Sequence, residues 1–279
     1  MNHKTENPDQ AEVFEPAELE WLLAAVVPPQ SAAADGVRHQ AIAGRLGQRM
    51  AHSIAEHAGL LTVRLKDGVW SPVKDGIRYK TLWRGGAVGN SVLIEFAAGA
   101  ALPVHRHSWL EEGIVLRGGL QIGELELGLF DYHVAPAGSR HASIQSRQGA
   151  LAFLRGTSLG DGATVLRELL GGLLPFRGGS AQTVFANDEG WQELGSGVFK
   201  KELYADGGMA SCFYRLLPGA TVPAHAHLKN EECMMLEGDV FLGDILLREG
   251  EYQLAPAGSA HGLAYTDVGA LLFVRGAAG

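Results

Sequence analysis

The sequence has few cysteines, and they are not spaced for metal or redox chemistry. Only Cys212 and Cys233 occur among the 279 residues, and neither belongs to a C-x-x-C motif. A zinc ribbon or a thioredoxin-like active site therefore has no support. Because an isolated cysteine most often serves as a small buried hydrophobic side chain, we interpret Cys233 as a core residue.

Long apolar runs, a positive net charge and a secretion signal are also missing. No stretch approaches the roughly 18 consecutive apolar residues of a transmembrane helix, and the first ten residues are polar. The net charge is −8 at pH 7, which argues against general binding to nucleic acid. We therefore expect a cytoplasmic protein that contacts neither a membrane nor nucleic acid directly.

Several common catalytic signatures are also absent. The sequence shows no Ser/His/Asp arrangement, no phosphate-binding loop and no dinucleotide-binding fingerprint. These absences leave metal binding by histidine and acidic residues as the chemistry to examine.

Histidine and glutamate form a spaced pattern in residues 219–261. His225 and His227 are two apart, so on an extended strand both side chains leave the same face. Glu231 follows after a short polar interruption, and His261 follows about one hairpin later. Three imidazoles and one carboxylate that converge on one point make a site for a divalent transition metal.

The same pattern occurs 120 residues earlier in the chain. The eight candidate metal ligands in the two repeats are His105, His107, Glu111 and His141, and His225, His227, Glu231 and His261. The repeat extends to L-A-F-L-R-G at 151–156 and L-L-F-V-R-G at 271–276. A repeat at a fixed offset predicts a duplicated domain. Duplication also means that the two quartets are not independent evidence, and we expect at least one of them to hold a metal ion.

Periodicity predicts strands for most of the chain and helices near its start. From 69 to 156, and again from 191 onward, short apolar segments are separated by glycine or proline at intervals of roughly 8–12 residues, which is typical of antiparallel sandwiches and barrels. Before them, residues 16–27 and 32–57 carry apolar stripes with helical spacing. We predict a helical hairpin that precedes the β domains.

The two blocks resemble the two cupin motifs, G-x5-H-x-H-x3-E-x6-G and G-x5-P-x-G-x2-H. The second repeat matches both, whereas in the first Phe130 replaces the leading glycine of the second motif, a departure that we expect to alter a turn without touching a ligand. The resemblance covers residues 68–279. It implies two double-stranded β-helix (jelly-roll) barrels, each holding up to one divalent metal ion, with zinc first and iron, manganese or nickel as alternatives.

A second resemblance concerns the helical segment. Its L-L-A-A-V-V-P-P stretch, followed by a helix rich in alanine and arginine, resembles the linker of ChrR-type anti-sigma factors, which carry a cupin-like domain at the C-terminus. This implies a sensory or regulatory protein whose N-terminal helices bind a sigma factor or another regulatory partner. No cysteine precedes Cys212, however, so the zinc site of their sigma-binding domain is missing. Alternatively, the helices cover a sheet or form a dimer contact, and we expect a homodimer.

These observations predict an all-β protein with two tandem cupin barrels after an N-terminal α-helical hairpin. The expected parts are a tail with the hairpin over 1–60, cupin domain 1 over 61–159, a linker over 160–190 and cupin domain 2 over 191–279. The leading function is a metal-binding bicupin of the ChrR type, similar to an anti-sigma factor, that senses a small-molecule ligand in its barrel, or an oxidant, in transcriptional regulation. The alternative is a metal-dependent dioxygenase or related oxidoreductase acting on a small diketone, acid or phenol. A third alternative is that one site is vestigial and supports only folding.

The remaining acidic and histidine residues receive ordinary roles. Glu111 and Glu231 lie seven residues before Gly118 and Gly238, as the ligand of the motif does, so their neighbours Glu112 and Glu232 are predicted to face solvent. Five histidines outside the motif are interpreted as surface or core residues. These are His3, His39, His52, His57 and His133.

Overall fold

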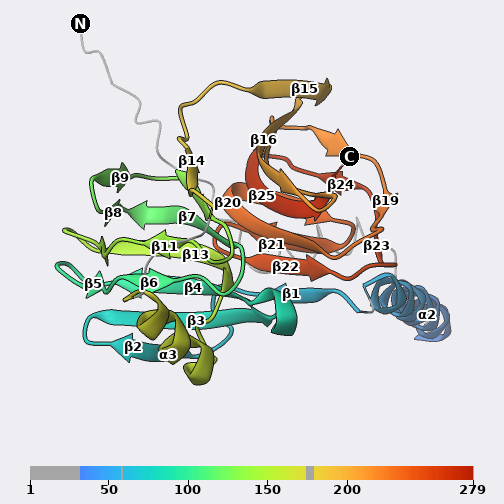
Figure 1. The fold of residues 1–279 in the computed structure, drawn as a ribbon. Helices are drawn as coiled ribbons and strands as arrows, with labels where there is room; N and C mark the ends of the chain where they lie inside the picture. Colours follow the sequence, from blue (N-terminus) through green and yellow to red (C-terminus); the bar gives the residue numbers. More distant parts are fainter. Residues whose placement is uncertain (1–31, 58, 174–178, 279) are drawn as a thin grey trace, which may run out of the picture. The chain divides into compact units, whose positions relative to one another are not determined.

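The computed structural model describes residues 32–57, 59–173 and 179–278 (Figure 1). The helix predicted over 16–27 lies outside the described residues. Residues 1–55 and 56–279 form two separate units, and each is considered by itself.

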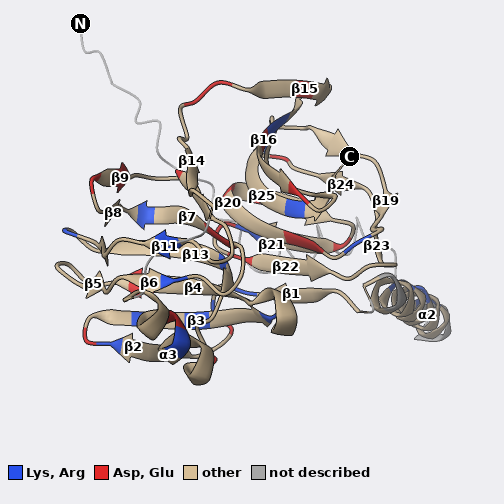
Figure 2. Ribbon diagram, viewed as in Figure 1, with Lys and Arg blue, Asp and Glu red and all other residues tan. Residues whose placement is uncertain are grey.

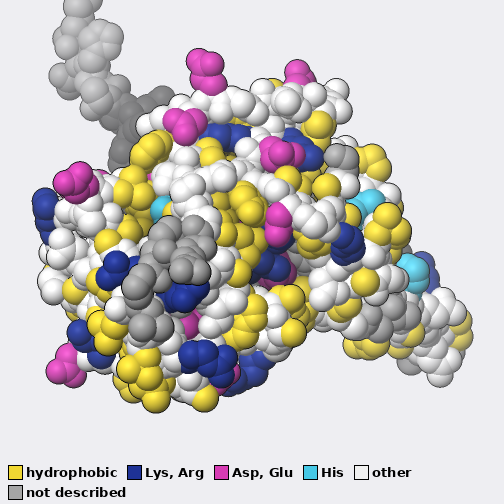
Figure 3. All heavy atoms as spheres, in the orientation of Figure 1, with side chains coloured by type: hydrophobic (Ala, Val, Ile, Leu, Met, Phe, Trp, Pro, Cys, Tyr) yellow, Lys and Arg dark blue, Asp and Glu magenta, His cyan; other side chains and the backbone are white. Residues whose placement is uncertain are grey.

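The described part of the first unit is one long helix. Helix α2 spans Ala32–Glu56, which confirms the predicted second helix. Its apolar stripe is exposed: Val37, Leu46 and Ile54 show 57–69% of their surface to solvent, and hydrophobic side chains are visible on this helix in Figure 3. No helix among the described residues is long and apolar enough to span a membrane.

The second unit begins with the barrel that we call barrel 1, which contains strands β2 to β13 and also β14. Its sheets run in the orders β14-β10-β7-β13-β4-β3-β2, β5-β12-β8-β9 and β11-β6. The elements are β2 (Trp70–Lys74), β3 (Ile77–Arg84), the short helix η1 (Gly86–Val88), β4 (Asn90–Phe96), β5 (Ala101–Leu102), β6 (His105–Arg106), β7 (Glu111–Gly118), β8 (Leu120–Ile122), β9 (Leu125–Leu127), β10 (Tyr132–Ala135), β11 (Arg140–His141), β12 (Ile144–Gln145), β13 (Ala150–Thr157), helix α3 (Gly162–Gly171) and β14 (Gln182–Val184).

Barrel 2 contains strands β15 to β25 and also β1. Its main sheet follows the path β1-β22-β20-β25-β17-β16-β15, with β18, β21 and β24 attached to it, and β19 pairs with β23. The elements are β1 (Leu61–Val63), β15 (Trp191–Gly195), β16 (Val198–Asp206), β17 (Met209–Leu216), β18 (Thr221–Val222), β19 (His225–Ala226), β20 (Glu231–Leu242), β21 (Ile245–Arg248), β22 (Tyr252–Ala255), β23 (Ala260–His261), β24 (Ala264–Tyr265) and β25 (Ala270–Ala277). The prediction of two tandem barrels in a mostly β chain is confirmed.

The two barrels exchange their first strands. Strand β1, which precedes barrel 1 in the chain, pairs with β22 of barrel 2 and places Thr62 opposite Gln253. Strand β14, which precedes barrel 2, pairs with β10 of barrel 1 and places Thr183 opposite His133. The segment predicted as a linker over 160–190 therefore contains a helix and a strand that belong to barrel 1.

The turn before β10 keeps its shape in spite of its unusual residue. Phe130 has a φ of 61°, the positive value that L-residues rarely adopt, and Gly250 at the same place in barrel 2 has a φ of 79°. Both turns make the same backbone hydrogen bond, from Phe130 N to Val115 O at 2.8 Å and from Gly250 N to Met235 O at 2.9 Å. The expectation that Phe130 alters this turn was wrong, because the neighbouring ladder holds the phenylalanine in the conformation of a glycine.

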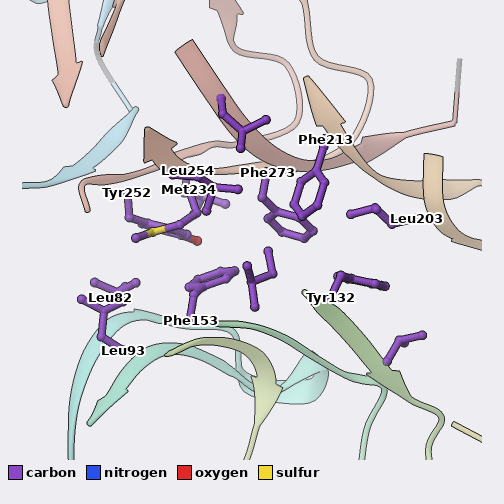
Figure 4. Packing of buried hydrophobic residues seen from close by; sticks show 14 residues of the cluster. Leu82, Leu93, Tyr132, Phe153, Leu203, Phe213, Met234, Tyr252, Leu254 and Phe273 are labelled. Atoms are coloured by element: carbon purple, nitrogen blue, oxygen red, sulfur yellow. The ribbon is translucent and has the colours of Figure 1, made fainter. Parts of the chain in front are cut away.

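The largest apolar cluster lies between the two barrels. Its aromatic members point toward one another from the two facing sheets (Figure 4). The ring of Phe153 lies 5.7 Å from that of its counterpart Phe273 and 6.1 Å from that of Tyr252, measured between centroids. Burial of aromatic rings of this size contributes strongly to stability. The barrels therefore share this cluster in addition to the apolar core inside each barrel, and together they form one compact unit.

A buried network of charges crosses the same interface. Glu112 and Glu232 are 1% and 3% exposed, so the prediction that both face solvent was wrong. The Arg155 guanidinium donates to both carboxylates, from Nη1 to Glu112 at 3.1 Å and from Nε to Glu232 at 2.7 Å. Each carboxylate also accepts from a serine hydroxyl of the other barrel, Ser211 for Glu112 and Ser91 for Glu232. The face that looks like an exposed strand face in the sequence is covered by the sister barrel.

Charged groups elsewhere are dispersed. In Figure 2 acidic and basic residues occur on many strands and loops of both barrels, and Figure 3 shows them mixed with polar and hydrophobic side chains on the visible face. The prediction that the chain does not bind nucleic acid directly stays a prediction.

Candidate metal centres

The strand pair β6–β11 and the start of β7 carry the candidate ligands of barrel 1. His105 pairs with His141 across the ladder, and their ring centroids are 5.5 Å apart. His107 follows β6 and is held by a hydrogen bond from its backbone N to Ser139 O at 3.0 Å. Glu111 is the first residue of β7. Four short-range constraints thus direct four side chains toward one point.

Barrel 2 repeats this construction on β19, β23 and β20. His225 pairs with His261, with ring centroids 5.6 Å apart. The backbone N of His227 donates to Ser259 O at 2.9 Å, and Glu231 is the first residue of β20. The duplicated sequence spacing is therefore a duplicated backbone geometry.

Both predicted quartets converge. In barrel 1 the ligand atoms of all four residues lie within 4.8 Å of one another, and in barrel 2 those of His225, His227 and Glu231 do. His261 lies beside them, with its Nε2 at 4.0 Å from Glu231 Oε1 and its ring centroid 4.6 Å from that of His227. The structure brings together all eight side chains that the sequence singled out.

Backbone carbonyls orient the first histidine of each quartet. His105 Nδ1–H donates to Pro103 O at 3.0 Å, and His225 Nδ1–H donates to Pro223 O at the same distance. A proton on Nδ1 leaves the lone pair of Nε2 directed into the quartet. This is the carbonyl-to-imidazole support that metal-ligating histidines commonly have.

Unpaired nitrogen atoms test whether a metal ion fits. The buried Nε2 atoms of His107 and His227 have no hydrogen-bond partner among the described residues, and neither do the Nδ1 atoms of His141 and His261. Buried polar atoms without partners are rare in folded proteins. A divalent ion bound by nitrogen and carboxylate donors would give ring nitrogens of the quartet a partner, and the donor set suits zinc, iron, manganese or nickel. The residues present fit such an ion in both barrels.

Comparison with known proteins identifies the family. A family model described as the ChrR cupin-like domain matches residues 59–159 and 180–278. The chain belongs to the ChrR cupin-like family. Both of its barrels are therefore cupin barrels, as the motif resemblance implied. A search of curated proteins gave no match.

Solved structures share the bicupin fold at low identity. A provisionally assigned dioxygenase from Nostoc punctiforme matches with a TM-score of 0.59 and 18% identity, over 77% of this chain and 81% of that chain. AerE from Microcystis aeruginosa matches with a TM-score of 0.53 and 16% identity, over 76% and 97%. A Bacillus subtilis oxalate decarboxylase, studied for its Mn(II) centres, matches with a TM-score of 0.53 and 18% identity, over 78% and 77%. At these identities the likeness establishes the fold alone.

Burial sets the electrostatics of the quartet in cupin barrel 1. Desolvation, with the neighbouring histidines, lowers the pKa of His107 to about 3 and that of His141 to about 2. Desolvation, with the nearby Glu168 carboxylate, raises the pKa of Glu111 to about 8. Without a bound cation the site thus favours neutral imidazoles and a protonated carboxyl. A divalent ion would favour the ionised carboxylate and keep the imidazoles neutral.

The quartet of cupin barrel 2 is more open to solvent. The Glu231 side chain is 22% exposed, compared with 10% for Glu111. Desolvation and His227 lower the pKa of His261 to about 4, while the Glu231 carboxylate acts in the opposite direction. The two centres therefore share their donors and differ in their surroundings.

His133 is a functional candidate that the sequence did not single out. It is 8% exposed, and its Nε2 lies 3.0 Å from Nε2 of His141, while its Nδ1 contacts Thr183 Oγ1 at 2.8 Å. Desolvation lowers its pKa to about 4. Gln253 occupies the same position in barrel 2 and donates to Thr62 Oγ1 at 3.0 Å. His133 belongs to no sequence motif. Its ring is oriented in part by Thr183 on the exchanged strand β14, a contact between residues that are far apart in the sequence.

Helix α3 brings a second carboxylate to barrel 1. Glu168 is 9% exposed, and it accepts hydrogen bonds from Ser108 N at 2.8 Å and from the Ser158 hydroxyl. The helix ends against β6, where a Cβ on Gly172 would lie 2.7 Å from Val104 O, so only glycine allows this close approach. Helix α3 therefore seals the quartet of barrel 1 on one side.

A cavity of about 270 Å³ adjoins this quartet. His105, Glu111, His141, His133 and Glu168 face it from one end. Most of the remaining lining is aliphatic and comes from the interior of barrel 1 and from α3. Such a mostly apolar hollow with a few convergent polar groups is the usual form of a small-molecule site.

The other histidines have mixed surroundings. His39 and His52 belong to the exposed helix α2, and His3 lies outside the described residues. His57 is half-buried, and its charge would disfavour protonation of His261. Cys233 is buried in the core of barrel 2, in agreement with its interpretation as a small hydrophobic residue.

Proposed function

We propose that this bicupin is a metal-dependent enzyme, an oxidoreductase acting on a small organic molecule, with its reaction centre in barrel 1. The observation that carries the proposal is the cavity that ends at His105, Glu111 and His141. Four protein donors on a six-coordinate ion leave positions for a substrate oxygen or for dioxygen, which the adjacent cavity could admit. A metal that binds there would supply Lewis-acid or redox chemistry.

The residues around the quartet have distinct parts in this proposal. His105 is oriented by Pro103 O, and Glu111 supplies the negative charge that a cation needs. His133 and Glu168 face the cavity without belonging to the quartet. They are the groups able to hold or move a proton beside a bound substrate, since imidazole and carboxyl groups are common general acids and bases.

For barrel 2 we propose a supporting role. Its quartet is suited to hold a metal ion, and its interior is filled by a continuous apolar cluster that includes Cys233, Met235 and Leu272. A metal ion there would add stability to the folded state. This keeps the alternative of one non-catalytic site and assigns it to the second repeat.

Loading the purified chain with Fe(II), Mn(II), Ni(II) or Zn(II) tests the proposal. Elemental analysis should give up to one ion per barrel. Oxygen uptake should then appear with at least one member of a panel of diketones, phenols and small acids. Addition of nitric oxide to the Fe(II) form should give an S = 3/2 electron paramagnetic resonance signal, which reports an open coordination position. Tetrahedral zinc as the only tightly bound ion, with neither the signal nor oxygen uptake, would overturn it.

A regulatory function is the second candidate, and helix α2 is the observation that favours it. Val37, Leu46 and Ile54 form an exposed apolar stripe, and such stripes are commonly covered by a partner. The expected partner is a sigma factor or another regulatory protein in the cytoplasm, or a second copy of the chain in a homodimer. Light scattering on the purified chain separates dimer from monomer. Co-purification of a sigma factor with the full chain, lost in Leu46→Glu, would favour regulation.

A further inference from the structure

The interiors of the two barrels differ at equivalent positions. Gly113 and Ala152 line the cavity of barrel 1, and their counterparts in barrel 2 are Cys233 and Leu272. Val115, which also lines the cavity, corresponds to Met235. The three larger counterparts are 0–5% exposed and pack in one cluster. At these three positions the side chains of barrel 1 are smaller than their counterparts in barrel 2, which leaves space for the cavity.

The body of this cavity can offer a ligand little except apolar contact. Ile94, Leu120, Ile122, Leu127 and Ile144 are among the side chains that form its wall. From helix α3, Val165 and Leu169 add to the same lining. A polar group placed against this wall would lose its hydration without a hydrogen bond in return. The occupant of this part must be hydrocarbon.

The polar end of the cavity contains two carboxylates. Glu168 and Glu111 both line the cavity beside His105 and His141. An anionic group of a ligand at this end would lie beside both carboxylates, and like charges at short range repel each other. Lys74 also lines the cavity, but it is exposed to solvent. An uncharged oxygen group suits this end better than an anion.

We propose that barrel 1 binds an uncharged amphipathic molecule, with a hydrocarbon body in the aliphatic cavity and a single alcohol, phenol or carbonyl oxygen at the His/Glu end. The inference rests on the proposed function for the identity of the reacting site, and it narrows the substrate class. The proposed ligand class excludes acids and compact polar molecules. It also predicts that barrel 2 binds no equivalent ligand.

Calorimetry of the full chain with straight-chain 1-alkanols tests the proposal, in metal-free and in metal-loaded protein. Affinity should rise roughly fourfold with each added methylene until the cavity is filled, because each buried CH2 contributes a constant increment. Alkanoates of the same length should bind more weakly than the alkanols in both forms. Affinity that does not depend on chain length would refute the claim that the ligand has a hydrocarbon body. Tighter binding of alkanoates than of alkanols would refute the claim that its oxygen group is uncharged.

Variants locate the binding site. Ala152→Leu puts the residue of barrel 2 into the cavity and should weaken binding of the longest alkanol that fits by at least about tenfold. Ala205→Leu makes the same change at an exposed position of barrel 2 and should leave affinity unchanged. If Ala152→Leu fails to fold, Gly113→Ala serves, because the closest atom to its new methyl is the end of the flexible Leu154 side chain, at 3.1 Å, and the next are backbone oxygens at 4.0 Å. In this variant the alkanol with the highest affinity should be about one methylene shorter than in wild type. Equal affinity in wild type and in the cavity variant that folds would refute the assignment.

Binding and reactivity fail separately in this design. Alkanol binding that follows chain length, in protein whose Fe(II) form gives no nitric oxide signal, would keep the ligand class and overturn the proposed enzyme. A nitric oxide signal from protein that binds no alkanol would support the open coordination position and refute the proposed ligand class.

Discussion

Barrel 1 and barrel 2 carry the same four donors on equivalent strands and differ in several of the groups that surround them. In barrel 1 helix α3 and Glu168 close one side of the quartet, His133 approaches His141, and small side chains leave a cavity. In barrel 2 Gln253 replaces His133, and larger side chains fill the interior.

This comparison separates what is needed to hold a metal ion from what is needed to use it. Donor spacing and carbonyl support are nearly identical in both barrels, as the bonds from His105 to Pro103 and from His225 to Pro223 show. A cavity, a fourth histidine (His133) and a second carboxylate (Glu168) occur in barrel 1. Reactivity should therefore follow the surroundings and not the quartet.

The matched pair His105→Ala and His225→Ala gives the largest expected effect. Each variant should lose about one metal ion per chain. Only His105→Ala should lose oxygen uptake, by at least about a thousandfold, because a catalytic metal contributes several kcal/mol of transition-state stabilisation. Elemental analysis and an oxygen electrode measure the two effects. Loss of activity in His225→Ala alone would reverse the roles of the barrels.

The buried ion pairs between the barrels provide the next largest effect. Arg155→Met leaves Glu112 and Glu232 without their shared partner, and removal of one member of a buried ion-pair network typically costs about 3–5 kcal/mol of stability. Arg275→Met should cost less, because Arg275 lies 3.5 Å from Glu112 and pairs more closely with the partly exposed Asp206. Chemical denaturation measures both free energies of unfolding.

An exposed ion pair is the control for that measurement. Arg117 is 68% exposed and pairs with Glu95, so Arg117→Met should change stability by less than about 1 kcal/mol. A cost for Arg155→Met as small as this would mean that the charged network does not join the barrels.

The pH dependence of Glu111→Gln should produce an effect of a few kcal/mol at most. In metal-free protein the folded state holds a proton on Glu111 up to about pH 8, whereas the ordinary pKa is 4.5. Between these values the unfolded chain binds fewer protons, so wild-type stability falls as pH rises. The variant does not titrate there and should gain up to about 1.4 kcal/mol per pH unit relative to wild type.

Denaturation of metal-free protein across this pH range measures the gain. Metal-loaded protein provides the contrast, because there Glu111→Gln removes a ligand and should destabilise. A difference between variant and wild type that stays constant from pH 5 to pH 8 in metal-free protein would contradict the burial of an uncompensated carboxyl.

The parts of the molecule that the sequence predicted depend on short-range geometry. A spacing of two residues places His105 and His107 close together, and the pairing of β11 with β6 sets His141 opposite His105. The duplicated motif therefore predicted both quartets and both barrels. Helix α2 also followed from its own periodicity.

The parts that the sequence missed depend on contacts between distant segments. Glu112 looks like the outward member of an alternating strand, but the sister barrel covers that face, so alternation no longer distinguishes core from solvent. His133 is supported by Thr183, which arrives on an exchanged strand. The size of the cavity depends on side-chain size at equivalent positions, such as Ala152 in barrel 1 and Leu272 in barrel 2. This difference can be interpreted only when both side chains are known to point inward.

Substitutions at His133 and at its counterpart Gln253 should give the smallest effect. They test one difference between the two barrels at a single position. His133→Gln keeps the quartet intact, so metal content should be unchanged, while oxygen uptake should fall by about 10–100-fold, the range typical of groups that support metal ligands. Gln253→His is the matched control and should leave activity unchanged. Because His133 can exchange a proton and glutamine cannot, the pH profile of the remaining activity should also lose one ionisation. If His133→Gln lowers metal content together with activity, His133 acts as a fifth ligand, and the two centres differ in their donors as well as in their surroundings.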